Sequence, residues 1–384
     1  RSWEEVSPYA APARRHAVGL DPMLHVDPDT GRIFTADIQA VVGCSAMVSF
    51  SDDDGESWIT SKVCGLTDHQ NVFSGPPPAG GPAPIGYPNV VYYCAIDGGV
   101  LGAYGTMTSC VKSLDGGITW TRTGEPAFHD DPRIEGGGSL GINGHCTGAT
   151  GHGFVDSEGR VYIPRGYCGN PWLAISEDEG RTWARVQVAS NGMAYDKGSQ
   201  LEEHEAAVAV DDEGNVYYAW ADRRRLPFLA VSRDGGETWS KPMMIGPPGI
   251  KETSLPNMDV GAPGKIAVTY YGSTNAPGGK TPPGTGPGYE SATWNAYTTI
   301  TANALAKDPT FYTVAMNDPR QPLLWGGCGI LRCGALYDFL DVDIAPDGTA
   351  WTALVDACPE AGRESCLDFG LGIVGRVTGG PRLR

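Results

Sequence analysis

Short apolar runs that lead into one recurring turn motif are the dominant pattern along the chain. The runs at 46–48, 173–175 and 229–231 are each followed within three residues by the sequence Ser-x-Asp-x-Gly-x-(Ser/Thr)-Trp. Its four copies start 62, 63 and 56 residues apart, at residues 51–58, 113–120, 176–183 and 232–239. A period of this length predicts one supersecondary unit repeated along the chain.

Each copy of the motif has the chemistry of a hairpin turn that caps itself. The Asp accepts hydrogen bonds from turn amides, the Gly takes a positive φ, and the Trp packs the turn against its neighbour. A second turn, built from an Asp, a Gly and an aromatic residue between β-forming residues, precedes most copies, at 26–34, 155–162, 210–217 and 344–351. Two hairpins per period predict one four-stranded antiparallel sheet per repeat.

The recurring motif is an Asp box, and the chain resembles the sialidase-like β-propellers with BNR/Asp-box repeats. The resemblance implies an all-β, six-bladed β-propeller of four-stranded antiparallel blades with Asp-box hairpins, or seven blades if the N-terminal arm contributes strands. Nearly the whole chain is covered by six units, at residues 20–65, 85–125, 150–190, 203–246, 255–315 and 337–380. The box of the fifth unit is reduced to 301–305, and the sixth unit has none.

The resemblance also predicts the domain organisation. We expect a single sialidase-like domain over residues 1–384, with an N-terminal arm at 1–19 and a Pro/Gly-rich flap insertion at 272–294. Asp boxes lie on the outer rim of such propellers and occur in hydrolases, lyases and non-catalytic receptors. They therefore predict the fold and not the activity.

Composition narrows the kinds of partner. The 54 Gly and 30 Pro residues are typical of a chain with many tight turns. The 45 acidic and 28 basic residues give a net charge of −17, which repels phosphate backbones and anionic lipids. No apolar run is long enough to span a bilayer. We therefore expect no nucleic-acid partner and no membrane insertion.

The ten cysteines fall in close sequential pairs. Their spacing matches no zinc motif, so we expect five local disulfides, 44–64, 94–110, 146–168, 328–333 and 358–366. Such bonds persist in oxidising compartments, and no charged-then-apolar leader opens the sequence. We expect a secreted, extracellular protein from which any export signal has been removed.

The site of such a propeller is expected at its axial mouth, where blade-joining loops meet the loops between second and third strands. Sialidases hold the substrate carboxylate with three arginines and use a Tyr nucleophile with a Glu partner. Glu205, Arg223 and Tyr337 stand at positions that resemble this pattern. The first arginine is replaced by the sequence at 19–22, and none occurs near Trp294, so we expect no true sialidase activity.

Histidines suggest a second constellation, since four of the seven fall in blade-joining loops: His69, His145, His152 and His204. Some propeller polysaccharide lyases pair a His base with a Tyr acid at a uronic acid, whose carboxylate an Arg neutralises. The predicted catalytic residues are His69, His145, His204, Glu205 and Tyr337. The predicted substrate-binding residues are Arg165, Asp222, Arg223, Tyr270, Tyr271 and Asp338. The structural alternative for each histidine is a hydrogen bond to a loop carbonyl.

Carboxylates offer a third reading of the same region. Asp341 and Asp343 alternate along a predicted strand and therefore share one face. Paired carboxylates can perform glycosidase acid/base chemistry, hold a structural Ca²⁺, or cap turns. We predict no cofactor and no catalytic metal, and a structural Ca²⁺ is left open.

Two functions follow from these observations. The first is a secreted glycoside hydrolase or uronate-directed polysaccharide lyase that acts on a poly- or oligosaccharide, with an acidic one favoured by the arginines. The second is a non-catalytic extracellular propeller that binds glycan or protein, or assembles with copies of itself. The broken arginine pattern favours the second, and the coincidence of Glu205, Arg223 and Tyr337 favours the first.

Overall fold

The computed structural model describes residues 6–8, 20–39, 44–66, 68–97, 107–129, 148–193, 206–278, 291–325, 340–356 and 371–384. Within these ranges every regular element is a β-strand, and no helix occurs. The chain divides into two compact units. Unit 1 comprises Arg1–Asp131, Gly153–Ile163 and Ala174–Arg185; unit 2 comprises Pro132–His152, Pro164–Leu173 and Val186–Arg384.

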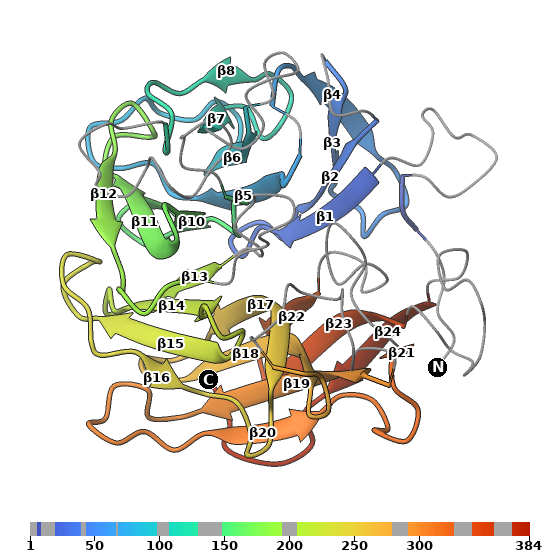
Figure 1. Ribbon diagram of the computed structural model, residues 1–384. Coiled ribbons are helices and arrows are strands. Elements are labelled where there is room, and N and C mark those ends of the chain that lie inside the picture. The colour runs from blue at the N-terminus through green and yellow to red at the C-terminus, as the bar shows by residue number, and fades with distance from the viewer. Residues whose placement is uncertain are drawn as a thin grey trace. The chain divides into compact units, whose positions relative to one another are not determined.

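Unit 1 contains two complete four-stranded antiparallel sheets, drawn in blue to teal in Figure 1. The first consists of β1 (Leu20–Val26), β2 (Ile33–Ile38), β3 (Ala46–Ser51) and β4 (Ile59–Val63). The second consists of β5 (Asn71–Gly75), β6 (Val90–Ile96), β7 (Thr108–Ser113) and β8 (Thr121–Arg122). A third four-stranded sheet is divided between the units and consists of β9 (Phe154–Val155), β10 (Val161–Tyr167), β11 (Asn170–Ser176) and β12 (Ala184–Gln187).

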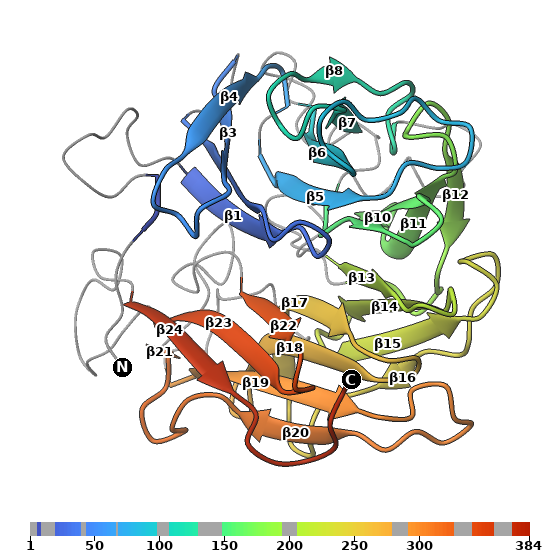
Figure 2. The ribbon, with the colours of Figure 1, turned by 180° about the vertical axis from the view of Figure 1, so that it is seen from behind.

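Unit 2 contains the other three sheets, which Figure 2 shows from behind in yellow to red. The fourth sheet consists of β13 (Ala207–Val210), β14 (Val216–Ala221), β15 (Pro227–Ser232) and β16 (Met243–Met244). The fifth consists of β17 (Glu252–Val260), β18 (Ile266–Ser273), β19 (Thr293–Thr301) and β20 (Tyr312–Ala315), with β21 (Leu324–Trp325) also paired to β19. The sixth consists of β22 (Asp341–Ile344), β23 (Ala350–Asp356) and β24 (Leu371–Arg376).

The six-bladed β-propeller predicted from the repeats is confirmed. The described strands form six antiparallel sheets whose strand order follows the sequence, and not seven. Two blades depart from four strands: the fifth gains β21, and the sixth shows three strands within the described residues. Four of the second strands are completely covered: every residue is buried in β6, β10, β14 and β18.

All four Asp boxes fold into the same turn. The Ser hydroxyl donates to the Asp carboxylate and accepts the Gly N–H, and the carboxylate accepts the N–H of the seventh residue. In the box at 232–239 these distances are 2.6 Å from Ser232 Oγ to Asp234 Oδ1, 2.8 Å from Gly236 N to Ser232 Oγ, and 2.9 Å from Thr238 N to Asp234 Oδ1. The box glycines have φ between 78° and 101°, which explains their identity.

The reduced box of the fifth blade keeps part of this hydrogen-bond pattern with other residues. Thr301 Oγ1 donates to Asn303 Oδ1 at 2.9 Å and accepts Asn303 N–H at 3.2 Å, as Ser and Asp do elsewhere. Asn303 Oδ1 also accepts the N–H of Thr310 at 2.9 Å. Part of the Asp-box hydrogen-bond pattern therefore occurs here without the Asp-box sequence.

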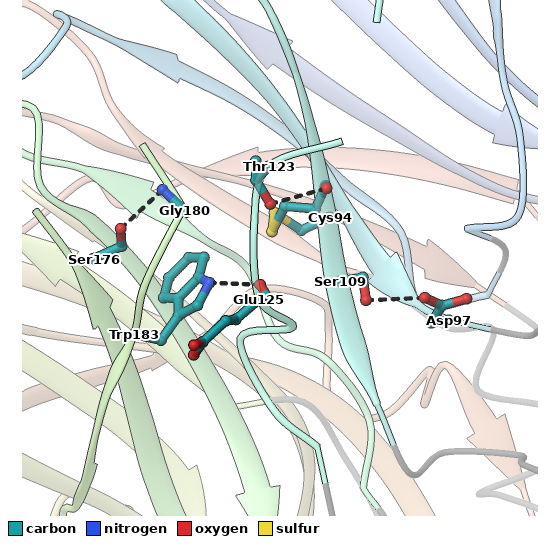
Figure 3. Close-up of a disulfide and its surroundings, with 9 residues drawn as sticks. Cys94, Asp97, Ser109, Thr123, Glu125, Ser176, Gly180 and Trp183 are labelled. Atoms are coloured by element: carbon teal, nitrogen blue, oxygen red, sulfur yellow. Dashed lines mark hydrogen bonds between the residues drawn. A yellow bond between two sulfur atoms is a disulfide. The ribbon is translucent and has the colours of Figure 1, made fainter. Parts of the chain in front are cut away.

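In unit 1 the boxes also fasten neighbouring sheets together (Figure 3). The indole N–H of Trp183 donates to Glu125 O at 3.0 Å, and the indole of Trp120 donates to Ser61 Oγ at 2.8 Å. From the predicted N-terminal arm, Val6 O accepts the indole N–H of Trp58 at 2.8 Å. Each Trp thus reaches a segment outside its own hairpin.

Two of the five predicted disulfides are confirmed, Cys44–Cys64 and Cys94–Cys110, and the second joins paired residues of β6 and β7 (Figure 3). Cys168 is also disulfide-bonded, and its partner lies outside the described residues. The other cysteines of the predicted pairs lie outside them too: Cys146, Cys328, Cys333, Cys358 and Cys366. In the described part of the chain, no helix is long and apolar enough to cross a membrane.

Candidate functional site

Strained backbone gathers at one end of the sheets. We call this end the proximal edge: it is where the first strand of a sheet begins and where its second and third strands are joined. Eight described non-glycine residues have a positive φ, and two of them belong to Asp boxes. Five of the rest lie at proximal edges and the sixth in β17: Asp21, Asp68, His69, Cys168, Arg225 and Leu255.

The first strands β1 and β17 are also irregular near their beginnings. The pairing register shifts between Leu20 and Met23 in β1, and between Ser254 and Asn257 in β17. Bulges and left-handed non-glycine residues cost energy and concentrate at functional sites, where they aim side chains. The proximal edges and first strands are therefore where a site is expected, opposite the Asp boxes.

In unit 2, β17 lies between β13 and β22, and polar side chains connect these first strands (Figure 1). Asn257 of β17 donates from Nδ2 to Asp341 Oδ1 at 2.7 Å and to Leu340 O at 3.1 Å. The same amide nitrogen lies 3.5 Å from His152 Nδ1, and His152 bridges Ala207 at the start of β13. Segments from three blades thus meet at one amide.

Asp259 lies two residues further along β17, on the same face as Asn257. Its carboxylate accepts the N–H of Ile344 on β22 at 2.7 Å and that of Val260 at 2.8 Å. Loss of hydration, together with the negative charges of Asp343 and Asp341, outweighs these hydrogen bonds and raises the pKa of Asp259 to about 7. Asp259, whose pKa is raised, therefore lies near two carboxyl groups of the neighbouring strand, Asp341 and Asp343, and burial raises the pKa of Asp341 as well.

A buried ion pair lies at the proximal edges of the fourth and fifth blades. Arg225 Nη1 is 3.9 Å from Glu252 Oε2, and both side chains are at most 3% exposed. The Arg225 carbonyl accepts the N–H of Thr253 at 2.7 Å and its hydroxyl at 3.0 Å. The pair joins the loop before β15 to the start of β17, and removal of either charge would leave the other buried.

Three residues predicted to bind substrate are fully buried: Arg165, Tyr270 and Tyr271. The Tyr270 hydroxyl is 2.8 Å from Thr299 Oγ1, and the Tyr271 hydroxyl accepts the N–H of Val355 at 3.0 Å. The Arg165 guanidinium lies 5.9 Å from the ring centre of Tyr167. These side chains support the interior of the blades and present no surface to a sugar in this conformation.

The other predicted residues of the fourth blade separate into two roles. Asp222 is buried and accepts the N–H groups of Arg224 at 2.9 Å and Leu226 at 3.0 Å, so it holds the loop between β14 and β15. Arg223 is exposed, with its side chain packed against Gly192. Arg224 of the same loop is exposed too, and its Nε lies 3.1 Å from Asp222 Oδ2, so Arg223 is the exposed arginine of the loop that does not pair with Asp222.

His69 is mostly buried at the start of β5, with φ of 47° after Asp68 at 89°. The following side chain, Gln70, donates to the carbonyl of Asp21 in β1. Two first strands of unit 1 are thus tied at their strained ends. The remaining predicted residues lie outside the described residues: His145, His204, Glu205, Tyr337 and Asp338.

Sequence reasoning missed part of this arrangement. Asn257, Asp259 and the pair Arg225–Glu252 were not predicted, although the alternation of Asn257 and Asp259 on one strand was a usable signal. In the described part of the chain, no three His, Cys, Asp or Glu residues form a group that could hold a metal ion. The structural Ca²⁺ stays a prediction.

Comparisons with known proteins agree with this architecture. The family model described as BNR/Asp-box repeat matches residues 230–241, within the fourth blade. A protein of unknown function from Dyadobacter fermentans is 15% identical with a TM-score of 0.50, over 92% of this chain and 93% of its own. No curated protein matches the sequence.

Two solved structures with the same likeness are intramolecular trans-sialidases. The one from Ruminococcus gnavus, in complex with oseltamivir carboxylate, is 12% identical with a TM-score of 0.51, over 96% of each chain. The one from leech, in complex with 2,7-anhydro-Neu5Ac, is 12% identical with a TM-score of 0.51, over 93% of this chain and 67% of its own. At this identity the likeness concerns the fold.

Six sheets in sequence order, four Asp boxes with one hydrogen-bond pattern, and these likenesses define the class. The chain is a six-bladed β-propeller with BNR/Asp-box repeats, similar in fold to the intramolecular trans-sialidases.

Proposed function

We propose that this protein is a secreted glycoside hydrolase whose site lies on the first strands of unit 2. The observation that carries the proposal is the juxtaposition of Asp259, whose pKa is raised to about 7, with the carboxylates of Asp341 and Asp343. Glycoside hydrolysis requires a carboxylic acid that protonates the leaving oxygen and a second, ionised carboxylate. Asp259 is the candidate acid, and Asp343 the candidate partner.

Other features support a carbohydrate as substrate. The structurally similar trans-sialidases were solved with oseltamivir carboxylate and 2,7-anhydro-Neu5Ac, both bound on the same fold. Exposed Arg223 supplies a cation for an acidic sugar, and the confirmed disulfides are typical of the oxidising extracellular space. An acidic oligosaccharide is the substrate class these features favour.

The second candidate is a non-catalytic extracellular propeller that binds a glycan. It is favoured by a specific observation: both oxygens of Asp259 accept backbone N–H groups, from Val260 and Ile344. An Asp that ties β17 to β22 has a structural role without catalysis. The uronate lyase hypothesis depends on His145, His204 and Tyr337, which lie outside the described residues.

One panel experiment separates these functions. The protein is incubated with sialyllactose, arabino-oligosaccharides and oligogalacturonates, and the products are followed by reducing ends and by absorbance near ~235 nm, where β-elimination products absorb. New reducing ends without this absorbance are expected. Absorbance together with reducing ends would make it a lyase, and binding without any product would make it a glycan-binding protein.

A further inference from the structure

A groove of about 560 Å³ lies beside the Asp box of the fourth blade, away from the first strands. One wall is formed by the box and by residues 240–243, and the other by residues 304–307 after the reduced box of the fifth blade. Its volume falls within the range of roughly 300–1,000 Å³ typical of ligand sites. Its charged lining residues are all basic: Arg233, Lys241 and Lys307.

Hydrogen bonds and ring contacts fix the walls of the groove. The Arg233 guanidinium donates to the carbonyl of Leu305 and so connects the two walls. The half-buried Trp239 donates its indole N–H to Gly236 O at 3.1 Å, and Tyr218 packs edge-on against its ring at 6.0 Å. An indole ring held by these contacts, with Arg233 bonded to the opposite wall, is therefore in place before any ligand binds.

The other Asp boxes show why this one is open. The indoles of Trp58, Trp120 and Trp183 each donate to a segment outside their own box, at Val6, Ser61 and Glu125, and Trp58 also donates to Gly55 O of its own box. Trp239 instead bonds a carbonyl of its own box, and Lys241 and Lys307 are exposed beside it. The protein has a net charge of −17, so basic residues are not needed to keep it soluble. Three of them beside one aromatic ring instead indicate a site for an anion.

We propose that this groove binds an anionic oligosaccharide, one that carries sulfate or carboxylate groups. Lys241, Lys307 and Arg233 would neutralise its charges, and the Trp239 ring supplies a flat apolar face for a sugar ring. An acidic peptide would use the cations and leave the ring face without a matching partner. The groove contains neither Asp259 nor its neighbours, so this inference goes beyond the proposed hydrolase and does not depend on it.

Titration calorimetry with the whole protein tests the inference, with a chondroitin sulfate hexasaccharide as probe and cellohexaose as its neutral counterpart. We expect the sulfated probe alone to bind, and its affinity to fall as ionic strength rises from about 0.05 to about 0.3 M. Replacement of both lysines, Lys241→Gln with Lys307→Gln, is expected to weaken binding at least about tenfold, since two exposed charge contacts are lost.

The matched control removes the same charge elsewhere: Lys62→Gln with Lys251→Gln, both exposed positions. This variant is expected to bind like the wild type. The proposal is overturned if no probe binds, if cellohexaose binds as well as the sulfated probe, or if the two double variants behave alike. Equal affinity for hexaglutamate would make the groove a peptide site and overturn it as well. None of these results depends on turnover.

Discussion

The Asp-box turns and the first strands of the sheets both hold acidic side chains, and they do so in opposite ways. In a box, Asp234 bonds Ser232 and Thr238, which are two and four residues away. On the first strands, distant partners are added to near ones. Asp27, directly after β1, accepts a hydrogen bond from Ser74, 47 residues away, and Asp259 accepts one from Ile344, 85 residues away.

The surroundings of Asp234 and Asp259 also shift the pKa values of these two carboxyl groups in opposite directions. Asp234 stays in water, and hydrogen bonds from Ser232 and Thr238 lower its pKa to about 2. Asp259 loses hydration between two strands, and its pKa rises to about 7. Long-range packing acts in both directions. At Asp27 loss of hydration is outweighed by hydrogen bonds, chiefly from Ser74 and Asn89, which lower the pKa, whereas at Asp259 loss of hydration dominates and raises it.

The largest effect is expected on turnover, once a substrate of the proposed hydrolase is in hand. Asp259→Asn removes the proton donor and should lower kcat at least about 100-fold, the usual contribution of a general acid. Asp234→Asn, in a box, should leave kcat within about twofold. If Asp259→Asn lowers folding stability but leaves kcat unchanged, Asp259 has a structural role only, and the result contradicts its role as the general acid.

The next largest difference is expected in the free energy of unfolding, which substitutions in the two regions should lower by different amounts. Asp27 is fully buried and accepts hydrogen bonds from Ser74, Asn89 and the N–H groups of Asp29 and Thr30. Asp27→Ala leaves these buried donors unpaired and should lower the free energy of unfolding by about 3 kcal/mol. Asp178→Ala, in a box open to water, should cost about 1 kcal/mol. Urea titration measures both, and equal losses would contradict the comparison.

Backbone strain offers a third contrast. Gly117 of the second box has φ of 97°, and an added Cβ would lie 3.1 Å from the Phe34 ring, so Gly117→Ala should cost about 2 kcal/mol. Asp68 holds φ of 89° with a full side chain, so Asp68→Gly should leave stability within about 0.5 kcal/mol or raise it. Thermal unfolding of both variants provides the measurement. A large loss in Asp68→Gly would show that its side chain, and not its backbone, is needed.

A fourth contrast is the pH dependence of stability, which should have opposite signs in the two regions. The folded pKa of Asp259, about 7, lies above its ordinary value of 3.8, so its contribution is complete below 3.8 and is lost as pH rises toward 7. For Asp234, with a folded pKa of about 2, the contribution is present above 3.8 and lost as pH falls. Asp259→Asn should flatten the stability profile between pH 4 and 7, and Asp234→Asn only below pH 4. Urea midpoints measured across this range decide the signs.

The sequence predicted the parts of the protein that depend on near neighbours. The Asp boxes, the six repeats and the Cys94–Cys110 bond each lie within one hairpin or one period, and all appear in the structure. The candidate site was only partly predicted. His152 and Asp341 were noticed as residue types, but nothing in the sequence indicated that Asn257 would connect them.

What the sequence alone determined was therefore the repeating unit, because hydrogen bonds over two to four residues are encoded in the motif itself. The tertiary structure decided which polar residues became buried and against which partners. Tyr270 and Tyr271 were predicted to face a substrate, yet they lie inside a blade, while loss of hydration beside β22 raised the pKa of Asp259. The physical reason is that hydration and Coulomb interactions depend on distance in space, and the pattern of a strand specifies its own two faces but not what packs against them.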